Sequence, residues 1–307
     1  MVYTLTANPS LDYEMHTQSL ITGSVNRSTK ESLRAGGKGI NVALVLKNLG
    51  VDATALGFTA GFTGEQIETE LRNLGVNADF IRLKKGISRI NVKIESSEET
   101  EINSAGPEIT QDAADSLMKK MESLSDGDTL VLAGSIPPSL PKDFYRNILK
   151  KTSGKKIMTV VDASKNLLLD SLAEHPFLIK PNDAELGEIF SVEISSEESA
   201  VQHAKKLQEM GARNVLVSLG SKGAVLVCED GQVFSCPAPK GKVISTVGSG
   251  DSMVAGFIAG FQKNGSFKES LILGISAGSA SAFSEGLASA ESIEIIRQKV
   301  KDSFANS

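Results

Sequence analysis

Short apolar runs alternate with amphipathic stretches through the middle of the chain. The run "TLVLAGS" precedes "PKDFYRNILKKT", "KIMTVVDAS" precedes "KNLLLDSLAEH", and "PFLIKPN" precedes "DAELGEIF". Residues 130–132 and 160–161 are apolar at successive positions, as in strands that are covered on both faces. This alternation predicts an α/β fold with βαβ units around a largely parallel sheet.

Two regions, about residues 12–34 and 87–104, depart from this alternation. Each region has the pattern of polar-faced strands that follow one another without an intervening helix, as in "SRINVKIESSEETEIN". We expect a small sheet that extends from the main domain, and its uncovered face should lie over a ligand, a partner subunit or both. Near the C-terminus, "MVAGFIAGFQKNG", "SLILGISAGSASAF" and "IEIIRQKVKDSF" predict three helices. We therefore expect one domain over residues 1–307.

Composition narrows the class of protein. The chain has 307 residues, of which 40% are hydrophobic, and its net charge of −5 lacks the basic surplus of nucleic-acid-binding proteins. No stretch approaches the roughly 20 apolar residues of a membrane span, and "MVYTLTANPS" lacks the pattern of a signal peptide. The turn at "EDGQ" would not place Cys228 and Cys236 opposite each other, so we expect no disulfide. These features predict a cytoplasmic protein that binds neither nucleic acid nor membrane.

Several common catalytic motifs are absent. The chain has no G-x-x-x-x-G-K-[ST] motif, and no G-x-G-x-x-G follows the first strand. H-E-x-x-H and C-x-x-C are missing as well, and the three histidines are scattered. These absences argue against a P-loop ATPase, a standard dinucleotide-binding fold and a histidine metal site.

One helix start has an unusual composition. "STVGSGDSMVAGF" places Gly248, Ser249, Gly250 and Asp251 before an apolar run. Such residues are ordinary at a helix start, but glycines there also let an anion approach unpaired N–H groups. An anion repels a neighbouring carboxylate, so a carboxylate at this place indicates a function, such as accepting a proton from an attacking hydroxyl. Asp251 must be ionised for that task, and we expect that it needs no raised pKa.

Other glycine-rich stretches allow the same two interpretations. In "RAGGKGINVALVLKNLG", Gly37 and Lys38 stand at the start of a helix whose first turn carries Asn41. "VSLGSKGAVL" predicts a strand, a small-residue turn and a second strand. Each is consistent with plain structure, yet a nucleotide could lie between the turn at 218–223 and the helix start at Gly248.

Charged residues at other turns are further candidates. In "LIKPNDAEL", Asn182 and Glu185 either cap a helix or aim an amide and a carboxylate at a magnesium ion. Asp12 follows a proline turn at the edge of the small sheet. Arg89 opens one of its strands and, with Arg27 and Lys38, could form a positive pocket for a phosphate group.

Seven motifs in order along nearly the whole chain resemble those of the ribokinase-like (PfkB) carbohydrate kinases, and in particular of the branch that acts on phosphorylated sugars. The motifs are TANPSLD, AGGKGINVA, SRINVKI, AGSIPPS, KPNDAEL, VSLGSKGA and TVGSGDSMVAGF. The resemblance implies a three-layer α/β/α sandwich with a small β-sheet lid, which often forms dimer contacts.

The resemblance also implies roles for residues of this chain. Asp251 would be the catalytic base, and Gly248, Ser249 and Gly250 would form the anion hole, with Ser249 where Ala is more common. The residues implied to hold the sugar phosphate are Asp12, Gly37, Lys38, Asn41 and Ser135, with Arg89, Lys38 and Arg27 on its phosphate. Those implied to hold ATP are Ser218, Leu219, Gly220, Ser221, Lys222, Gly223, Lys180, Asn182, Thr246 and Gly250. Asn182 and Glu185 match the magnesium-linked motif of the family.

The implied reaction transfers the γ-phosphoryl group of ATP to a hydroxyl of a ketohexose phosphate. Fructose 1-phosphate, giving fructose 1,6-bisphosphate, is the first expectation, and tagatose 6-phosphate or fructose 6-phosphate are alternatives. Unphosphorylated sugars, or a non-catalytic sensor on the same fold, are further alternatives. The uncovered face of the small sheet predicts a homodimer.

Overall fold

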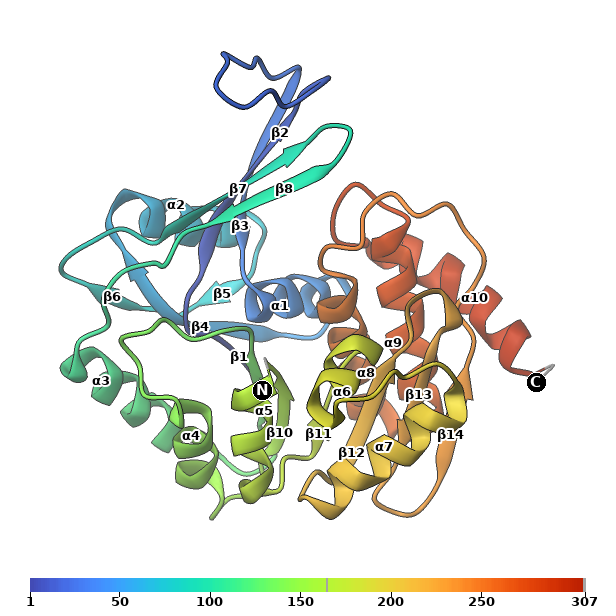
Figure 1. The fold of residues 1–307 in the computed structure, drawn as a ribbon. Helices are drawn as coiled ribbons and strands as arrows, with labels where there is room; N and C mark the ends of the chain where they lie inside the picture. Colours follow the sequence, from blue (N-terminus) through green and yellow to red (C-terminus); the bar gives the residue numbers. More distant parts are fainter. Residues whose placement is uncertain (164, 306–307) are drawn as a thin grey trace.

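The computed structural model describes residues 1–163 and 165–305, so positions 164, 306 and 307 of the predicted domain lie outside the described residues. Its centre is a ten-stranded sheet (Figure 1) with the order β14-β13-β12-β11-β10-β9-β1-β4-β5, and β6 also pairs with β4. The strands are β1 (Val2–Thr6), β4 (Ala53–Ala60), β5 (Asn77–Ala78), β6 (Ile81–Leu83), β9 (Thr129–Ala133), β10 (Met158–Asp162), β11 (Leu178–Ile179), β12 (Asn214–Ser218), β13 (Ala224–Val227) and β14 (Val233–Cys236).

The sheet is parallel except at one edge, where β13 and β14 pair antiparallel. Successive residues of a strand belong to two different hydrophobic clusters. In β9, Val131 packs in one cluster, whereas Leu130 and Leu132 pack in the other. Because neighbouring side chains of a strand point to opposite faces, both faces of the sheet are buried, as the apolar runs predicted.

Helices cover the two faces in separate groups. One group is α1 (Lys38–Asn48), α2 (Gly61–Asn73), α8 (Ser249–Asn264), α9 (Phe267–Ala282) and α10 (Ala290–Ala305). The other is α3 (Gln111–Glu122), α4 (Phe144–Thr152), α5 (Lys165–Ser171), α6 (Asp183–Phe190) and α7 (Glu197–Glu209). The three helices predicted near the C-terminus are confirmed, and the architecture is the expected three-layer α/β/α sandwich.

The predicted small sheet is also confirmed. Its strands are β2 (Ser10–His16), β3 (Lys30–Gly36), β7 (Arg89–Glu95) and β8 (Glu99–Asn103), in the order β3-β2-β7-β8. It projects from the main body (Figure 1). Asp12 lies within β2. Cys228 and Cys236 are buried free thiols, so the expectation of no disulfide is confirmed.

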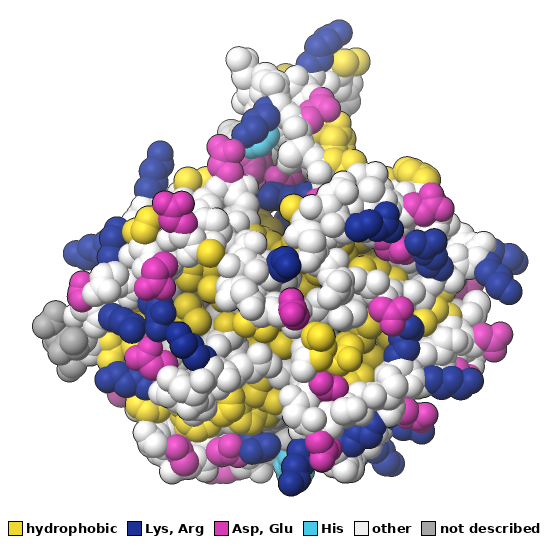
Figure 2. Space-filling view, turned by 180° about the vertical axis from the view of Figure 1, so that it is seen from behind, with side chains coloured by type: hydrophobic (Ala, Val, Ile, Leu, Met, Phe, Trp, Pro, Cys, Tyr) yellow, Lys and Arg dark blue, Asp and Glu magenta, His cyan; other side chains and the backbone are white. Residues whose placement is uncertain are grey.

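The small sheet has one polar and one apolar face. Asp12 pairs in register with Asn91, whereas the alternate residue Tyr13 pairs with Leu33 and Val92. On the apolar face Leu33 is 49% exposed, and Ile102 of β8 is 59% exposed. Figure 2 shows hydrophobic side chains along this projecting part of the molecule. Among the described residues, none of the helices is long and apolar enough to span a membrane.

Candidate active site

A cavity of about 980 Å³ lies between the polar face of the small sheet and the carboxyl ends of the main strands. Open α/β sheets bind ligands at this edge, because loops and helix starts gather there. Most of the predicted site residues line it. They are Asp12, Gly37, Lys38, Asn41, Arg89, Lys180, Asn182, Glu185, Ser218, Gly220, Ser221, Gly223, Thr246, Gly248, Ser249, Gly250 and Asp251.

Four predicted residues do not line this cavity. Leu219 is buried in the core, and the Lys222 ammonium donates to the Ser195 carbonyl oxygen at 3.1 Å. Arg27 is exposed between β2 and β3, and Ser135 is exposed after β9. The roles that the resemblance implied for these four side chains therefore lack support from the geometry of this chain.

The start of α8 is open toward the cavity. Gly248 has a φ of 77°, a left-handed conformation that favours glycine, and no side chain caps the helix. The Ser249 N–H donates to the Thr246 carbonyl at 3.2 Å, whereas the next amides of the first turn have no intrahelical acceptor. A Cβ on Gly250 would lie 3.2 Å from Lys180 Nζ, so glycine lets this ammonium group approach the helix start. Unpaired amides beside a cation make this place suitable for an anion.

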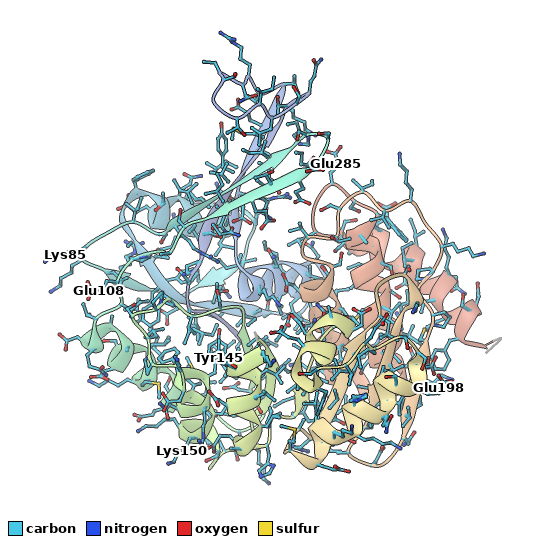
Figure 3. All side chains as sticks on the ribbon, viewed as in Figure 1. Lys85, Glu108, Tyr145, Lys150, Glu198 and Glu285 are labelled. Carbon is cyan, nitrogen blue, oxygen red and sulfur yellow. The ribbon has the colours of Figure 1, made fainter. Side chains whose placement is uncertain are left out.

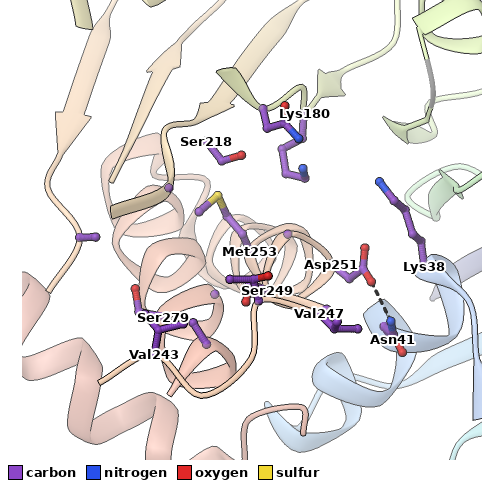
Figure 4. Close-up of a pocket in the computed structure, with 18 of the residues that line it drawn as sticks. Lys38, Asn41, Lys180, Ser218, Val243, Val247, Ser249, Asp251, Met253 and Ser279 are labelled. Atoms are coloured by element: carbon purple, nitrogen blue, oxygen red, sulfur yellow. Dashed lines mark hydrogen bonds between the residues drawn. The ribbon is translucent and has the colours of Figure 1, made fainter. Parts of the chain in front are cut away.

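Asp251 lies in the first turn of α8 and is only 5% exposed. Asn41 Nδ2 donates to Asp251 Oδ2 at 2.8 Å (Figure 4). Burial and the nearby charge of Asp162 raise the pKa of Asp251 to about 6, against the lowering effects of Lys38, Asn41 and Lys180. We expected that Asp251 needs no raised pKa. Its pKa is nevertheless raised, and Asp251 still ionises near neutral pH.

Two lysines converge on a buried carboxylate beside Asp251. Lys38 Nζ lies 3.1 Å and Lys180 Nζ 3.5 Å from Asp162 Oδ1. Burial alone would raise the pKa of Asp162, but the charges of Lys180 and Lys38 lower it. Burial opposes the charged form of Lys38, yet Asp162 and Asp251 raise its pKa, so its ammonium group stays charged. Two fixed cations thus face the open start of α8.

The motif at Asn182 caps α6. Asn182 Oδ1 accepts from the Glu185 N–H at 2.7 Å, and Glu185 Oε2 accepts from the Asn182 N–H at 2.9 Å. The structural interpretation of this motif is thus confirmed, and it uses one oxygen of each side chain. Within residues 1–163 and 165–305, no group of three or more His, Cys, Asp or Glu side chains is placed to hold a metal ion.

Sequence reasoning missed several polar residues of the cavity. Asn91 and Lys93 line it together with Arg89, and all three lie on one face of β7. Alternate residues of a strand share a face, so the position of Arg89 could have indicated both residues. Asp162 was missed too, although its place at the carboxyl end of a parallel strand could have indicated it.

Comparison with known proteins gives the family. Residues 6–294 match the model of the pfkB family carbohydrate kinases. The chain belongs to this family. It is 44% identical to a 1-phosphofructokinase of Bacillus subtilis over 301 residues, 98% of this chain and 99% of the relative. It is 39% identical to a D-tagatose-1-phosphate kinase of Bacillus licheniformis over 288 residues, 94% of each chain.

The solved structures agree with this assignment. The chain superposes on phosphofructokinase-2 from Escherichia coli in complex with substrates and products, with a TM-score of 0.92 and 29% identity, covering 98% of this chain and 99% of the other. The fold and family predicted from the motifs are confirmed. The protein is therefore a phosphotransferase of the carbohydrate kinase type, and ATP is the phosphoryl donor that this family implies.

Proposed function

We propose that this PfkB kinase phosphorylates a ketohexose phosphate with ATP, and that fructose 1-phosphate is its substrate and fructose 1,6-bisphosphate its product. The arrangement of Asp251, Lys38 and Lys180 at the open start of α8 is the observation that carries the phosphoryl transfer. The name of the 44% identical relative supports the choice of sugar.

In the proposed reaction, Asp251 accepts the proton of the attacking sugar hydroxyl. The hydroxyl oxygen forms a bond to the γ-phosphorus as the bond from phosphorus to the β–γ bridging oxygen breaks, and ADP leaves with that electron pair. Lys38 and Lys180 stabilise negative charge on the transferred group, and the free amides of the first turn of α8 donate to its oxygens. The pKa of about 6 keeps Asp251 ionised at neutral pH yet basic enough to take the proton.

Arg89 is suited to the phosphate already present on the sugar. Its Nε donates to the Asn8 carbonyl oxygen at 3.0 Å, and no described carboxylate lies within ion-pair distance of its guanidinium group. Burial lowers the pKa of Arg89, against the charge of Asp12, but a guanidinium group stays protonated at neutral pH. A half-buried cation without an ionic partner on the cavity wall favours an anionic ligand group.

The nucleotide would lie along the turn at 218–223, with Thr246 and Lys180 near its phosphates. Magnesium ions bind phosphates and few protein carboxylates, and they keep several waters. Asn182 and Glu185 fit this need, and the Glu185 carboxylate fits better, because the amide oxygen of Asn182 is already used by the helix cap. Magnesium would supply charge neutralisation on the ATP phosphates.

A substrate panel tests the proposal. ADP production is measured with fructose 1-phosphate, tagatose 1-phosphate, tagatose 6-phosphate, fructose 6-phosphate and ribose. We expect the highest kcat/KM with fructose 1-phosphate. Tagatose 1-phosphate is the second candidate, since the 39% identical relative is named for it.

Arg89→Ala should raise the KM for the sugar phosphate and leave the KM for ATP unchanged. The opposite result would place the sugar phosphate elsewhere.

We also propose a homodimer through the apolar face of the small sheet. Leu33 and Ile102 lie half-exposed there, opposite the polar face that lines the cavity. Sedimentation should give a dimer for the wild type and a monomer for Leu33→Glu combined with Ile102→Glu. Ile87→Glu, at an exposed site outside this sheet, is the matched control. A monomeric wild type would refute this assembly.

A further inference from the structure

Two buried hydroxyl groups lie behind the open start of α8. Ser252 of α8 and Ser281 of α9 are buried, and their Oγ atoms lie 2.7 Å apart. Ser252 Oγ donates to the Gly248 carbonyl oxygen at 2.8 Å, and Ser281 Oγ accepts from the Ala288 N–H at 3.0 Å. These two hydroxyls, which we call the serine bridge, therefore connect the loop after α9 to the first residue of the anion site.

The neighbours of the serine bridge fix the direction of its hydrogen bonds. The proton of Ser252 is used on the Gly248 carbonyl oxygen, which can only accept. Ser281 must therefore donate to Ser252 across the 2.7 Å contact. Ser281 in turn accepts from the Ala288 N–H. Each hydroxyl thus donates once and accepts once, and the bridge ends on the Gly248 carbonyl.

This carbonyl accepts two hydrogen bonds. Besides the Ser252 hydroxyl, the Ser252 N–H donates to it at 2.8 Å, as the first bond of the helix. Gly248 has a φ of 77° and no side chain to restrict its conformation, so these bonds fix the direction of its carbonyl. The peptide group is planar, so the Ser249 N–H turns together with the carbonyl. The serine bridge therefore sets the orientation of the peptide group from which α8 starts.

The other end of the serine bridge lies in a loop that packs on Gly248. A Cβ on Gly248 would lie 2.6 Å from Leu287 Cδ2, so Leu287 approaches this glycine closely. Both backbone polar groups of Ala288 are paired, because Asn48 Nδ2 donates to its carbonyl oxygen at 2.8 Å. The loop is thus anchored to α1 and α9 next to the residue that contacts the start of α8.

The same loop also touches the small sheet, through exposed groups. Lys30 Nζ lies 3.2 Å from Glu285 Oε2, and Arg34 Nη1 donates to the Glu285 carbonyl oxygen at 3.4 Å; Figure 3 shows Glu285 beside the small sheet. Exposed ion pairs contribute little to stability, whereas a buried N–H that loses its acceptor is costly. The buried bond to Ser281 therefore holds the loop more firmly than these contacts do.

We propose that Ser252 and Ser281 are positioning residues of the phosphoryl transfer, and that they hold the Gly248 peptide group so that the free amides of α8 face the transferred group. The inference rests on the proposed function and extends it to two residues that do not line the cavity. Hydrogen-bond donors stabilise a transition state when they are in place before the reaction begins. A small shift of this peptide group should therefore slow the transfer without weakening the binding of either substrate.

Removal of the Ser252 hydroxyl tests the proposal. In Ser252→Ala the Gly248 carbonyl keeps its bond to the backbone N–H, so we expect this variant to fold. Its kcat should fall by about tenfold to a hundredfold, and the KM values for the sugar phosphate and ATP should stay within about twofold. The assay uses the best substrate of the sugar panel, so the result does not depend on fructose 1-phosphate.

A double variant tests whether the two serines act as one unit. Ser281→Ala should also lower kcat, since it removes the donor to Ser252 and the acceptor of the Ala288 N–H. Because Ser281 acts through Ser252, the double variant should lose no more than about twofold in kcat beyond Ser252→Ala. Fully additive losses would show that the two hydroxyls act separately and would refute the serine bridge.

Ser276→Ala is the matched control. Ser276 is buried in α9, as Ser281 is, and its hydroxyl donates to the Ile272 carbonyl oxygen at 2.6 Å within that helix. Its melting temperature should fall as in Ser252→Ala, whereas its kcat should equal that of wild type. Lys30→Ala, which removes an exposed contact of the loop, should also keep the wild-type kcat. A wild-type kcat in Ser252→Ala, or an equal loss in Ser276→Ala, would overturn the proposal.

Hydrogen exchange separates this inference from the proposed function. Without any sugar present, the protection factor of the amide at position 252 should fall about tenfold in Ser252→Ala and stay unchanged in Ser276→Ala. A wild type that phosphorylates none of the sugars would refute the proposed function, and the exchange would still decide whether the serine bridge holds the helix start. An unchanged protection factor in Ser252→Ala would overturn the proposal.

Discussion

The starts of α6 and α8 both face the cavity, but only one of them is closed by its own side chains. At α6, Asn182 and Glu185 satisfy each other's backbone N–H groups. At α8, Gly248 has no side chain, and amides of the first turn stay free. A helix start that is satisfied internally stabilises the fold, whereas an open one can bind an anion. The start of α6 is therefore closed by its cap, whereas the start of α8 is open to an anionic ligand.

The carboxylate at the open start of α8 has a pKa unlike that expected for its position. A helix start favours negative charge, which should lower the pKa of an acid in its first turn. Asp251 has a raised pKa at such a position, so burial beside Asp162 outweighs the helix dipole. Burial of the ionised Asp251 carboxylate therefore lowers the free energy of unfolding. Substitutions of Asp251 can measure its effect on this stability and on the reaction rate.

The largest expected effect is that of Asp251→Asn on turnover. Asparagine keeps the shape but cannot accept the proton, so kcat should fall by three orders of magnitude or more, of the order of 4 kcal/mol in the barrier. The dissociation constant for ATP should change little. Asp52→Asn, at an exposed position, is the control. Turnover close to wild type would remove Asp251 from the mechanism.

The same substitution should stabilise the protein above pH 6. Because the pKa of Asp251 rises from 3.8 to about 6 on folding, wild-type stability is lost as the pH rises through this window. Asparagine is neutral at every pH, so Asp251→Asn should gain about 1–3 kcal/mol at pH 8 and nothing below pH 4. Denaturant unfolding at the two pH values measures this, and a variant less stable than wild type at pH 8 would contradict it.

Asn41 should control the pH at which the base works. Its hydrogen bond lowers the pKa of Asp251, which Lys38 and Lys180 also lower and Asp162 raises. Activity is lost as the pH falls through this pKa, so Asn41→Leu should move the acidic limb of kcat/KM to higher pH, by up to about one unit. Asn48→Leu, on the same helix and bonded to the Ala288 carbonyl, should leave the limb in place. An unmoved limb in Asn41→Leu would show that this bond does not tune the base.

The sequence allowed the layers and the small sheet to be predicted, because strand periodicity reports which faces are covered. The sequence also identified the glycines and Asp251 at the start of α8 as candidate site residues. It could not show that Asp162 holds Lys38 and Lys180, since these residues come from three separate segments that only the tertiary fold brings together. The raised pKa of Asp251 was missed for the same reason, because burial depends on packing between distant helices. Arg27 and Ser135 do not line the cavity, so their roles stay predictions that rest on the motifs alone.

The smallest expected effects separate the two roles of the α6 start. Asn182→Ala removes the acceptor of the Glu185 N–H and should lower the free energy of unfolding by about 1 kcal/mol. Glu185→Gln keeps an acceptor for the Asn182 N–H, so its stability should stay near wild type, but it removes the charge. If Glu185 helps to hold magnesium, only Glu185→Gln should need a higher Mg²⁺ concentration for half-maximal activity. Equal Mg²⁺ dependence in both variants would leave Glu185 with the cap alone, and the α6 start would then serve stability without any part in catalysis.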